Sequence, residues 1–470
     1  MSMVVQHNMQ AANANRMLGI TSGAQAKSTE KLSSGYKINR AADDAAGLTI
    51  SEKMRKQIRG LDKASSNAQD GVSSVQTAEG ALTEVHSMLQ RMNELAVQSA
   101  NGTNSSDDRQ AIQDEVDQLT TEIDRVAETT KFNEIYLLKG DNSNTKNVYM
   151  KGHDAGLKGT LTDGAKSATF TMDALQAGDK YTIAGKEYTI GSATTEVTAL
   201  IDKANTDATA DTANKTVDVN GKTYTITYNV AGNTIADADG TAITLDNLKK
   251  AVTGGSKVTY GNTSLTAMTD ADTDGVDDDD SSIITKDVAE TKIKAELLTA
   301  NNIGTVDQAA TVEDANTANG KTSYTINKGY ATVADTLSFN LHVGADADMT
   351  NKITVDIDTM NSANLGIKGI NVKDASGTEA TYAIDAIADA VAKVSSQRSA
   401  LGAVQNRLEH TIDNLDNISE NTSSAESRIR DTDMAKEMVN YSKNNILAQA
   451  GQSMLAQANQ SNQGVLSLLQ

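Results

Sequence analysis

Apolar side chains recur at intervals of three and four residues near both ends of this 470-residue chain. Such spacing places them on one narrow stripe of an α-helix, as in coiled coils. Because a single amphipathic helix is marginal in water, we expect three such stripes to pack on one another. Their members are Val72, Val75, Leu82, Val85, Leu89, Met92 and Leu95; then Ile112, Val116, Leu119, Ile123 and Val126; and then Ile387, Val391, Val394, Leu401, Val404, Leu408, Ile412, Leu415 and Ile418.

Short polar segments mark the ends of the predicted helices. Residues 100–108, ANGTNSSDD, separate the first two stripes, and Ser105 or Ser106 can cap the second helix. Residues 421–424, NTSS, follow the third stripe, and we expect a helix break there. The further helical pattern beyond this break carries Met434, Met438, Ile446, Leu447, Met454 and Leu455.

Residues 141–380 have a different pattern, rich in Thr, Val, Ile, Tyr, Gly and Asp. Alternation with period two on both sides of Asn220-Gly221 predicts a β-hairpin. The motif Gly-Lys-x-Tyr-Thr-Ile occurs at 185–190 and 221–226, and again with one insertion at 320–326. Short helical patterns follow the first two copies, so we expect duplicated hairpin-and-helix modules in two subdomains.

These patterns predict a fold that is mainly α at both termini, where the N- and C-terminal helices pair as a long, coiled-coil-like rod. A central, β-rich α+β insert interrupts the rod. The chain contains no Pro, which suits long helices because Pro interrupts them.

Composition excludes several classes of function. There is no Cys, so disulfides and thiolate metal sites are excluded. A net charge of −20 repels phosphate backbones, and we expect no nucleic-acid partner. We find neither a signal-peptide pattern nor an apolar run long enough to span a bilayer, and so expect no membrane insertion. The His residues form no His-Glu-x-x-His motif and no phosphate-binding loop occurs, so we expect neither an enzyme nor a cofactor.

Three stretches carry a resemblance to a known family. Residues 31–47, KLSSGYKINRAADDAAG, resemble the N-terminal signature of bacterial flagellins, and residues 90–100 resemble their rod helix. Gln-Ala-Asn-Gln at 457–460 and Val-Leu-Ser-Leu-Leu at 465–469 resemble the flagellin C-terminus. The resemblance covers about residues 1–140 and 382–470.

The resemblance implies a secreted, extracellular structural subunit that polymerises into the flagellar filament for swimming motility. It implies an inner tube built from residues 1–45 and 425–470, and a rod layer built from residues 46–140 and 381–424. Residues 141–380 would then form the variable, surface-exposed insert. Its implied partners are further copies of the chain, an export chaperone at the C-terminus, and the filament cap and hook-associated proteins.

Residues 444–470 carry no charged side chain, which suits a helix packed in a crowded tube without unpaired buried charge. By the resemblance, its apolar residues would make the assembly contacts. These candidates are Leu447, Met454, Leu455, Val465, Leu466, Leu468 and Leu469.

The resemblance also implies that the monomer is recognised by Toll-like receptor 5, an innate immune sensor, through the rod helix. The matching positions are Gln90, Arg91, Glu94, Leu95, Gln98 and Glu115. An exposed Arg is a frequent hot spot of protein interfaces. The alternative interpretation is that Arg91 and Glu94 form a solvated ion pair that also packs against a neighbouring subunit.

Residues 270–281, DADTDGVDDDDS, begin like a calcium-binding loop, with Asp270, Asp272 and Asp274 before Gly275. The twelfth position is Ser281 rather than the Glu that such loops use, which favours an acidic surface loop.

Two alternative functions remain open at this stage. The first is a hook–filament junction protein, which shares related terminal helices. The second is a filament-borne adhesin, in which insert tyrosines stack on sugars. The tyrosines considered for this role are Tyr181, Tyr188, Tyr224 and Tyr228.

Overall fold

The computed structural model describes residues 8–270 and 274–467, with side chains described as far as Ser461. The chain forms two compact units. The first contains the described residues up to Val75, together with Phe339–Val355 and the described residues from Gly402 onward. The second contains Gln76–Ser338 and Asp356–Leu401. Two long helices, α2 (Ala45–Ala100) and α8 (Thr378–Arg430), contribute to both units.

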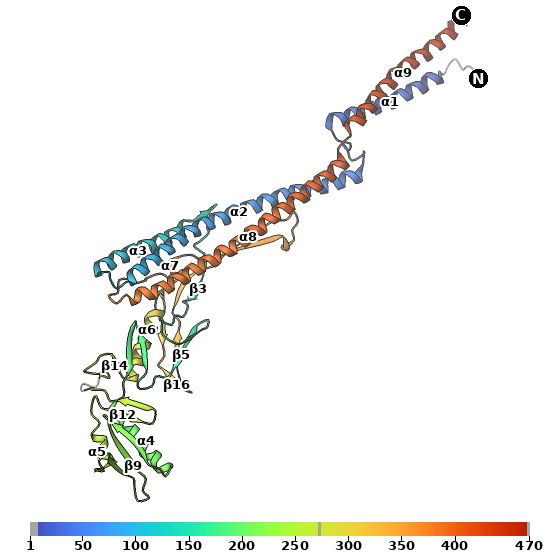
Figure 1. The fold of residues 1–470 in the computed structure, drawn as a ribbon. Helices are drawn as coiled ribbons and strands as arrows, with labels where there is room; N and C mark the ends of the chain where they lie inside the picture. The colour runs from blue at the N-terminus through green and yellow to red at the C-terminus, as the bar shows by residue number, and fades with distance from the viewer. Residues whose placement is uncertain (1–7, 271–273, 468–470) are drawn as a thin grey trace. The chain divides into compact units, whose positions relative to one another are not determined.

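In the first unit, the terminal helices α1 (Met9–Ser34) and α9 (Met434–Ser467) pair with each other (Figure 1). Asn8 caps α1, and its side-chain amide donates to the Ala458 carbonyl at 3.1 Å. Gly35 ends α1 at φ 77°, a conformation that favours glycine. The Lys37 amide then donates to the Arg430 carbonyl at 2.7 Å, which ties the end of α1 to the end of α8. The predicted pairing of the N- and C-terminal helices is confirmed.

The predicted helix break at residues 421–424 is wrong, because α8 continues through them to Arg430. The polar side chains bond within the helix instead of capping a new one. Asn421 donates to the Asn417 carbonyl at 2.8 Å, and Arg428 donates to the Ser424 hydroxyl at 3.1 Å. The break falls at Asp431–Asp433, where an oxygen of Asp433 accepts from the Lys436 amide at 3.0 Å and begins α9.

Residues Phe339–Val355 fall inside the predicted insert, but they lie in the helical first unit. They form most of the hairpin of β19 (Leu337–His342) and β20 (Lys352–Ile357), which are connected through the 3₁₀ helix η1 (Met349–Asn351). The hairpin packs on α2 and α8 through an apolar cluster. The cluster contains Ala68, Val72, Leu341, Val343, Ile353, Val404, Leu408 and Ile412.

In the second unit, α3 (Ser106–Thr129) joins α2 and α8. Most residues of the predicted stripes are buried or half-buried, and each fully buried Leu, Ile or Val contributes roughly 1.5–3 kcal/mol. The exception is Ile418 of the third stripe, which is 37% exposed. Ser105 caps α3 and forms a capping box with Asp108, as the sequence indicated. Residues 131–136 belong to the predicted rod segment 46–140, but they are not helical. They form a small hairpin of β1 (Lys131–Phe132) and β2 (Ile135–Tyr136). The stripe residues with no exposed surface are Val75, Leu82, Val85, Leu89, Met92, Val116, Ile123, Ile387, Val394 and Leu408.

Beyond these helices, α6 (Lys286–Asn301) and two small sheets share one apolar core, and the β18-β3 sheet has a separate small apolar cluster with Ala331 and Val333. Phe170, Tyr324 and Ile293 are fully buried in the shared core. The strand orders are β18-β3, β15-β17-β5-β4 with β16 at the edge of β17, and β14-β7-β6. Their bounds are β3 Asp141–Tyr149, β4 Thr160–Asp163, β5 Ser167–Asp173, β6 Lys180–Ile183, β7 Lys186–Ile190, β14 Ile283–Ile284, β15 Thr311–Val312, β16 Asn316–Ala318, β17 Lys321–Asn327 and β18 Tyr330–Asp335.

A second β-rich module has its own apolar core, with Val217, Ile226 and Leu248 fully buried. Helices α4 (Thr194–Ala210) and α5 (Leu245–Lys250) pack against a six-stranded sheet of order β11-β10-β9-β8-β12-β13. The strands are β8 Lys215–Val219, β9 Lys222–Thr227, β10 Thr234–Asp237, β11 Ala242–Ile243, β12 Lys257–Tyr260 and β13 Thr263–Thr266.

The three copies of the Gly-Lys motif begin at the turns of three hairpins. Asn220 and Gly221 have φ values of 54° and 78°, Ala184 and Gly185 have 51° and 76°, and Asn319 and Gly320 have 52° and 73°. Two consecutive positive φ values are typical of the type I′ turn that matches the twist of β-strands. The predicted hairpin at Asn220-Gly221 is confirmed as β8–β9.

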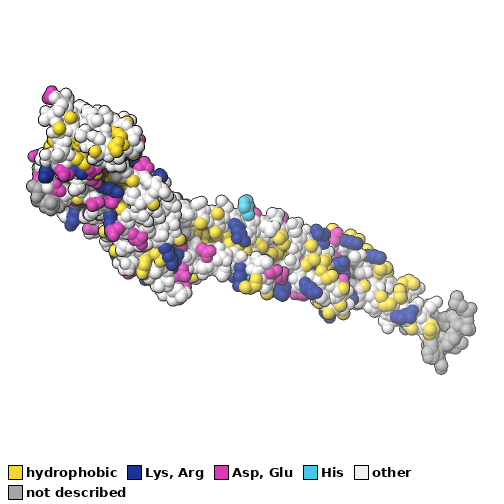
Figure 2. Space-filling model, turned by 90° about the horizontal axis from the view of Figure 1, so that it is seen from below, with side chains coloured by type: hydrophobic (Ala, Val, Ile, Leu, Met, Phe, Trp, Pro, Cys, Tyr) yellow, Lys and Arg dark blue, Asp and Glu magenta, His cyan; other side chains and the backbone are white. Residues whose placement is uncertain are grey.

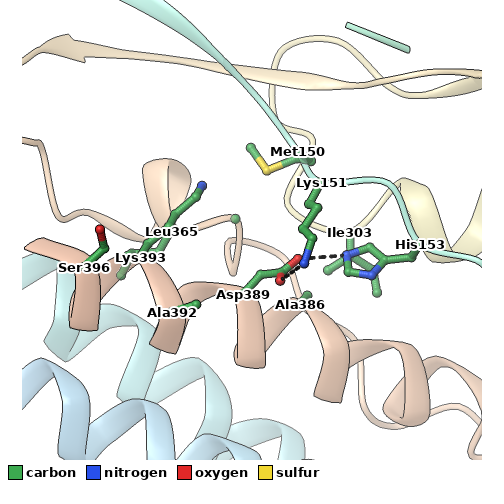
Figure 3. Close-up of a pocket in the computed structure, with 11 residues that line it drawn as sticks. Met150, Lys151, His153, Ile303, Leu365, Ala386, Asp389, Ala392, Lys393 and Ser396 are labelled. Atoms are coloured by element: carbon green, nitrogen blue, oxygen red, sulfur yellow. Dashed lines mark hydrogen bonds and ion pairs between the residues drawn. The ribbon is translucent and has the colours of Figure 1, made fainter. Parts of the chain in front are cut away.

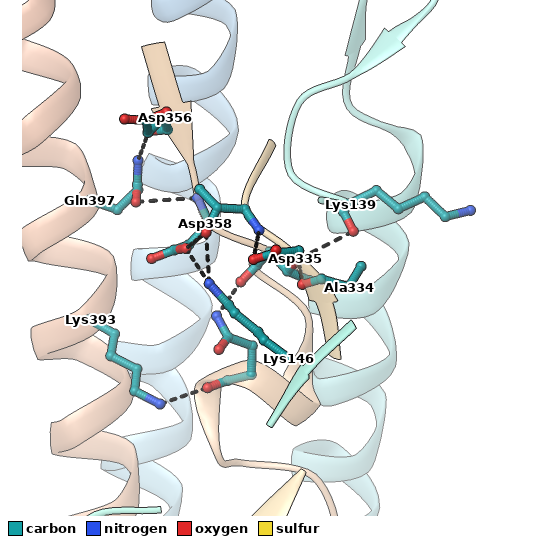
Figure 4. A network of polar contacts seen from close by, with 11 residues as sticks. Lys139, Lys146, Ala334, Asp335, Asp356, Asp358, Lys393 and Gln397 are labelled. Carbon is teal, nitrogen blue, oxygen red and sulfur yellow. Dashed lines mark hydrogen bonds and ion pairs between the residues drawn. The ribbon is translucent and has the colours of Figure 1, made fainter. Parts of the chain in front are cut away.

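A polar network connects β3, the end of β20 and α8 (Figure 4). Lys146 of β3 donates to the Thr336 hydroxyl and to Asp358, both at 2.7 Å. Gln397 of α8 donates to the Asp356 carbonyl at 3.0 Å. Burial acts to raise the pKa of Asp358, but the bonds from Lys146 and Thr336 outweigh it and leave that pKa lowered. Asp358 is therefore charged at neutral pH and holds β3 against the segment before α7 (Ser362–Leu365).

Within the described residues, no helix is both long enough and apolar enough to cross a membrane.

Candidate assembly and recognition surfaces

The α1–α9 pair leaves large apolar side chains in solvent. Figure 2 shows hydrophobic side chains among charged ones along the part of the chain that leads to the grey terminal residues. Isolated exposed apolar residues are normal, but a surface with many of them marks an interaction site. The exposed apolar residues of the two helices are Met9, Met17, Ile20, Met434, Met438, Val439, Ile446, Leu447 and Met454, with exposed fractions between 47% and 74%.

The predicted assembly residues fall into two groups. Leu447 and Met454 are exposed, and Leu455 is partly exposed on the same helix. The side chains of Val465 and Leu466 are not described, and Leu468 and Leu469 lie outside the described residues. Contacts between α1 and α9 are partly polar: the buried Ser28 hydroxyl bonds to Glu437 and lowers the pKa of that carboxyl.

A cluster around Arg430, the last residue of α8, connects the segment after α1 to α2. The Arg430 guanidinium lies 4.7 Å from the centre of the Tyr36 ring, and its Nη1 is 2.8 Å from Oε1 of Glu52. This hydrogen bond lowers the pKa of Glu52. Sequence reasoning missed the cluster, because its three members come from segments far apart in the chain.

Arg91 is the centre of an exposed ion-pair network on α2 and α3. Its Nε lies 2.9 Å from Oε1 of Glu115, and its Nη1 lies 3.1 Å from Oε2 of Glu94. Both carboxylates raise the pKa of Arg91, with Glu115 the larger influence. The alternative interpretation of Arg91 and Glu94 as a solvated pair matches this geometry. The structure adds a second ion pair, between Arg91 of α2 and Glu115 of α3.

The neighbours of Arg91 differ in exposure. Gln90 and Gln98 are exposed, and Gln90 also contacts the His86 ring at 3.1 Å. The placement of Leu95 on this exposed edge is wrong: its side chain is 2% exposed, because it belongs to the apolar stripe of α2. Val97, which the sequence reasoning missed, is 52% exposed beside Gln98. We call the exposed residues Gln90, Arg91, Glu94, Gln98 and Glu115 the Arg91 edge.

The turn next to the Arg91 edge is held by a buried cation that the sequence reasoning also missed. Arg109 is 4% exposed and donates to the carbonyls of Ser99, Asn101 and Ala375, at 3.2, 3.3 and 2.6 Å. One turn further along α3, Gln113 bonds the segment before α8, donating to the Ile370 carbonyl and accepting from the Val372 amide. These bonds fix the α2–α3 turn against the segment before α8.

The Asp-rich loop uses its described carboxylates for its own backbone. Asp270 accepts from the Gly275 amide at 3.1 Å, and Asp277 accepts from the amides of Asp279 and Asp280 at 3.0 Å. Asp272 lies outside the described residues. No group of three or more His, Asp or Glu side chains in the described part of the chain is arranged to hold a metal. The calcium hypothesis stays untested, without support from the described loop.

Most of the tyrosines proposed to stack on sugars have their faces or edges covered. Tyr181 is 8% exposed, and its hydroxyl donates to the Lys158 carbonyl at 2.8 Å. The ammonium of Lys186 lies 5.0 Å from the centre of the Tyr188 ring, and that of Lys222 lies 5.7 Å from Tyr224. Tyr181 is therefore too buried to stack on a sugar, and lysines occupy a face of Tyr188 and of Tyr224.

Comparison with known proteins agrees with the helical architecture. Residues 5–143 match the profile of the bacterial flagellin N-terminal helical region, and residues 384–469 match that of the C-terminal helical region. A flagellin of Clostridium tyrobutyricum is 40% identical over 467 residues, which cover 98% of this chain and 100% of the relative.

The chain belongs to the bacterial flagellin family. Flagellins of Bacillus subtilis (strain 168) and Salmonella rubislaw are 34% and 35% identical, covering 99% and 100% of this chain and the whole of each relative. As a flagellin, the protein is a structural subunit of the extracellular flagellar filament, into which it polymerises, and not an enzyme.

Proposed function

We propose that the exposed apolar residues of the α1–α9 pair are the surface through which this flagellin polymerises. The observation that carries the proposal is the exposure of Met9, Met17, Ile20, Leu447 and Met454 on two helices that already contact each other. Burying such side chains against other subunits contributes about 25 cal/mol per Å² of apolar surface. The absence of charge after residue 443 means that close packing there buries no unpaired ion.

The same exposed surface must be covered while the subunit is still a monomer. We therefore propose that an export chaperone binds α9 before assembly, and that the filament cap and hook-associated proteins contact the same terminal helices. Occupation of one surface by successive partners makes these interactions mutually exclusive.

The polymerisation test uses a chain truncated after residue 443 and seeded on filament fragments. We expect the full chain to elongate the seeds into long filaments, and the truncated chain to stay monomeric. Helical circular dichroism should fall by no more than α1 and the deleted part of α9 contribute, because α1 loses its partner whereas α2, α3 and α8 keep their own buried stripes. Long filaments from the truncated chain would refute the assigned surface.

We further propose that Toll-like receptor 5 recognises the monomer through the Arg91 edge. The supporting observation is the exposed guanidinium, 48% accessible and oriented by Glu94 and Glu115. An Arg already held in position loses little side-chain entropy on binding, and its remaining donors can bond a partner. Leu95 takes part only by holding α2 in place, since its side chain is buried.

The receptor test compares Arg91→Ala with Arg125→Ala in the purified monomer. Arg125 is a matched control, because it is an exposed Arg of α3 that pairs with Glu122 at an i,i+3 spacing. We expect Arg91→Ala to weaken receptor binding at least about fivefold, and Arg125→Ala to leave it unchanged. Equal affinity of the two variants in surface plasmon resonance would rule out the Arg91 edge as the contact.

A further inference from the structure

A cavity of about 300 Å³ lies in the second unit, between the segment that follows β3 and one face of α8. Figure 3 shows Lys393, Ala392, Asp389 and Ala386 along α8, with Met150 and the segment that carries His153 facing them. Ligand pockets usually measure ~300–1,000 Å³. This cavity is at the small end of that range and has room for one small organic molecule.

At one end of the cavity, the Asp389 carboxylate faces the side chains of Lys151 and His153. Oδ1 of Asp389 lies 2.9 Å from Nζ of Lys151, and Oδ2 lies 3.5 Å from Nε2 of His153 (Figure 3). The hydrogen bond to Asp389 raises the pKa of Lys151, so this lysine stays charged. Lys151 is therefore paired with Asp389, and His153 lies near the same carboxylate, which leaves the opposite end of the cavity, beside Lys393, as the place for a ligand's charge.

At that opposite end, Lys393 has unused hydrogen-bond donors. Its Nζ donates to the Asn364 carbonyl at 2.7 Å (Figure 4), and an ammonium carries three donors. Burial lowers the pKa of Lys393, against the opposite influence of Asp389 and Asp358 and together with that of Lys146. A partly buried ammonium gains from an added anion, because that anion replaces part of the lost hydration.

Between the two ends, the lining is mostly apolar. It contains Met150, Ile303, Leu365, Ala386 and Ala392, and Gly366 and Ser396 complete it. An aliphatic chain can fill this space, whereas a second charged group has no partner there. The carboxylates of Asp389 and Asp358 act on Lys393 from nearby, so they repel a dianion more strongly than a monoanion.

We propose that this cavity binds a small aliphatic monocarboxylate, with the carboxylate on Lys393 and the hydrocarbon chain against Leu365 and Ile303. Such a site is separate from the terminal helices and from the Arg91 edge. It requires neither polymerisation nor a receptor, so it can be tested on the full-length monomer.

The experiment titrates the monomer with hexanoate, acetate, hexanol and hexylammonium by calorimetry and saturation-transfer NMR. We expect saturable binding of hexanoate, and binding at least about tenfold weaker for acetate, which lacks the chain, and for hexanol, which lacks the charge. Hexylammonium should not bind. Equal affinity for hexanoate and hexanol, or the absence of saturable hexanoate binding, would overturn the proposal.

Variants identify the site. Lys393→Met removes the charge at nearly constant length and should weaken hexanoate binding at least about tenfold. The matched control is Lys368→Met, an exposed lysine of the same unit outside this cavity, which should bind as the native chain does. Ala392→Leu fills the cavity with the charge intact and should also abolish binding. Retained binding in Ala392→Leu overturns the proposal even if Lys393→Met fails to fold.

Discussion

Arg109 shows how much one buried side chain can organise. Its guanidinium reaches the carbonyls of Ser99 and Asn101 at the end of α2, and that of Ala375 before α8. A cation near a helix C-terminus is favoured by the helix dipole, and carbonyls left without donors there would be costly. The turn between α2 and α3 is therefore held by a charge rather than by an apolar core.

Replacing Arg109 by Met should destabilise the monomer by about 2–4 kcal/mol, because three carbonyls lose a charged donor at a buried site. Urea unfolding followed by circular dichroism measures the change. The control is Arg125→Met, which removes an exposed Arg from the same helix and should have a much smaller effect. Equal losses in the two variants would show that the buried bonds contribute nothing beyond a general loss of charge.

At the scale of the element, the effect of a glycine on a long helix depends on whether the glycine faces another element or solvent. Gly60 of α2 faces the β19–β20 connection: a Cβ there would lie 2.9 Å from Cβ and 3.1 Å from Cα of Ala345. Gly80 of the same helix has nothing within 4 Å of the equivalent position. One glycine therefore permits a close contact between elements, whereas the other only weakens the helix.

The two glycines should respond oppositely to Ala. Gly80→Ala should stabilise the chain by about 0.5–1 kcal/mol through helix propensity. Gly60→Ala gains the same propensity but displaces Ala345, and should lower stability or release the hairpin. Hydrogen exchange should then be faster in Lys352–Ile357 for Gly60→Ala and unchanged for Gly80→Ala. Increased stability of both variants would mean that the hairpin does not rest on Gly60.

At the scale of the whole molecule, the sequence predicted what depends on periodic burial. Spacings of three and four residues identified the buried stripes of α2, α3 and α8, and Asn220-Gly221 identified its hairpin. The wrong or missing predictions concern residues whose role depends on contacts with distant parts of the chain. The polar residues at 421–424 resembled a break until their bonds within α8 were known, and Leu95 resembled a surface residue through family matching. The three carbonyls held by Arg109 come from segments that no local pattern connects.

Net charge also acts on the whole molecule, because every subunit that joins a filament carries −20. Like-charged subunits repel, and salt screens this repulsion over a Debye length of about 10 Å at 0.1 M. Seeded elongation, followed by light scattering, should therefore be several-fold faster at about 200 mM than at about 20 mM NaCl. Replacing Asp173 and Asp314 by Asn removes two carboxylates that are 91% and 94% exposed, and should reduce the salt dependence. A rate that falls with added salt would mean that attractive ion pairs between subunits outweigh the repulsion of their net charges.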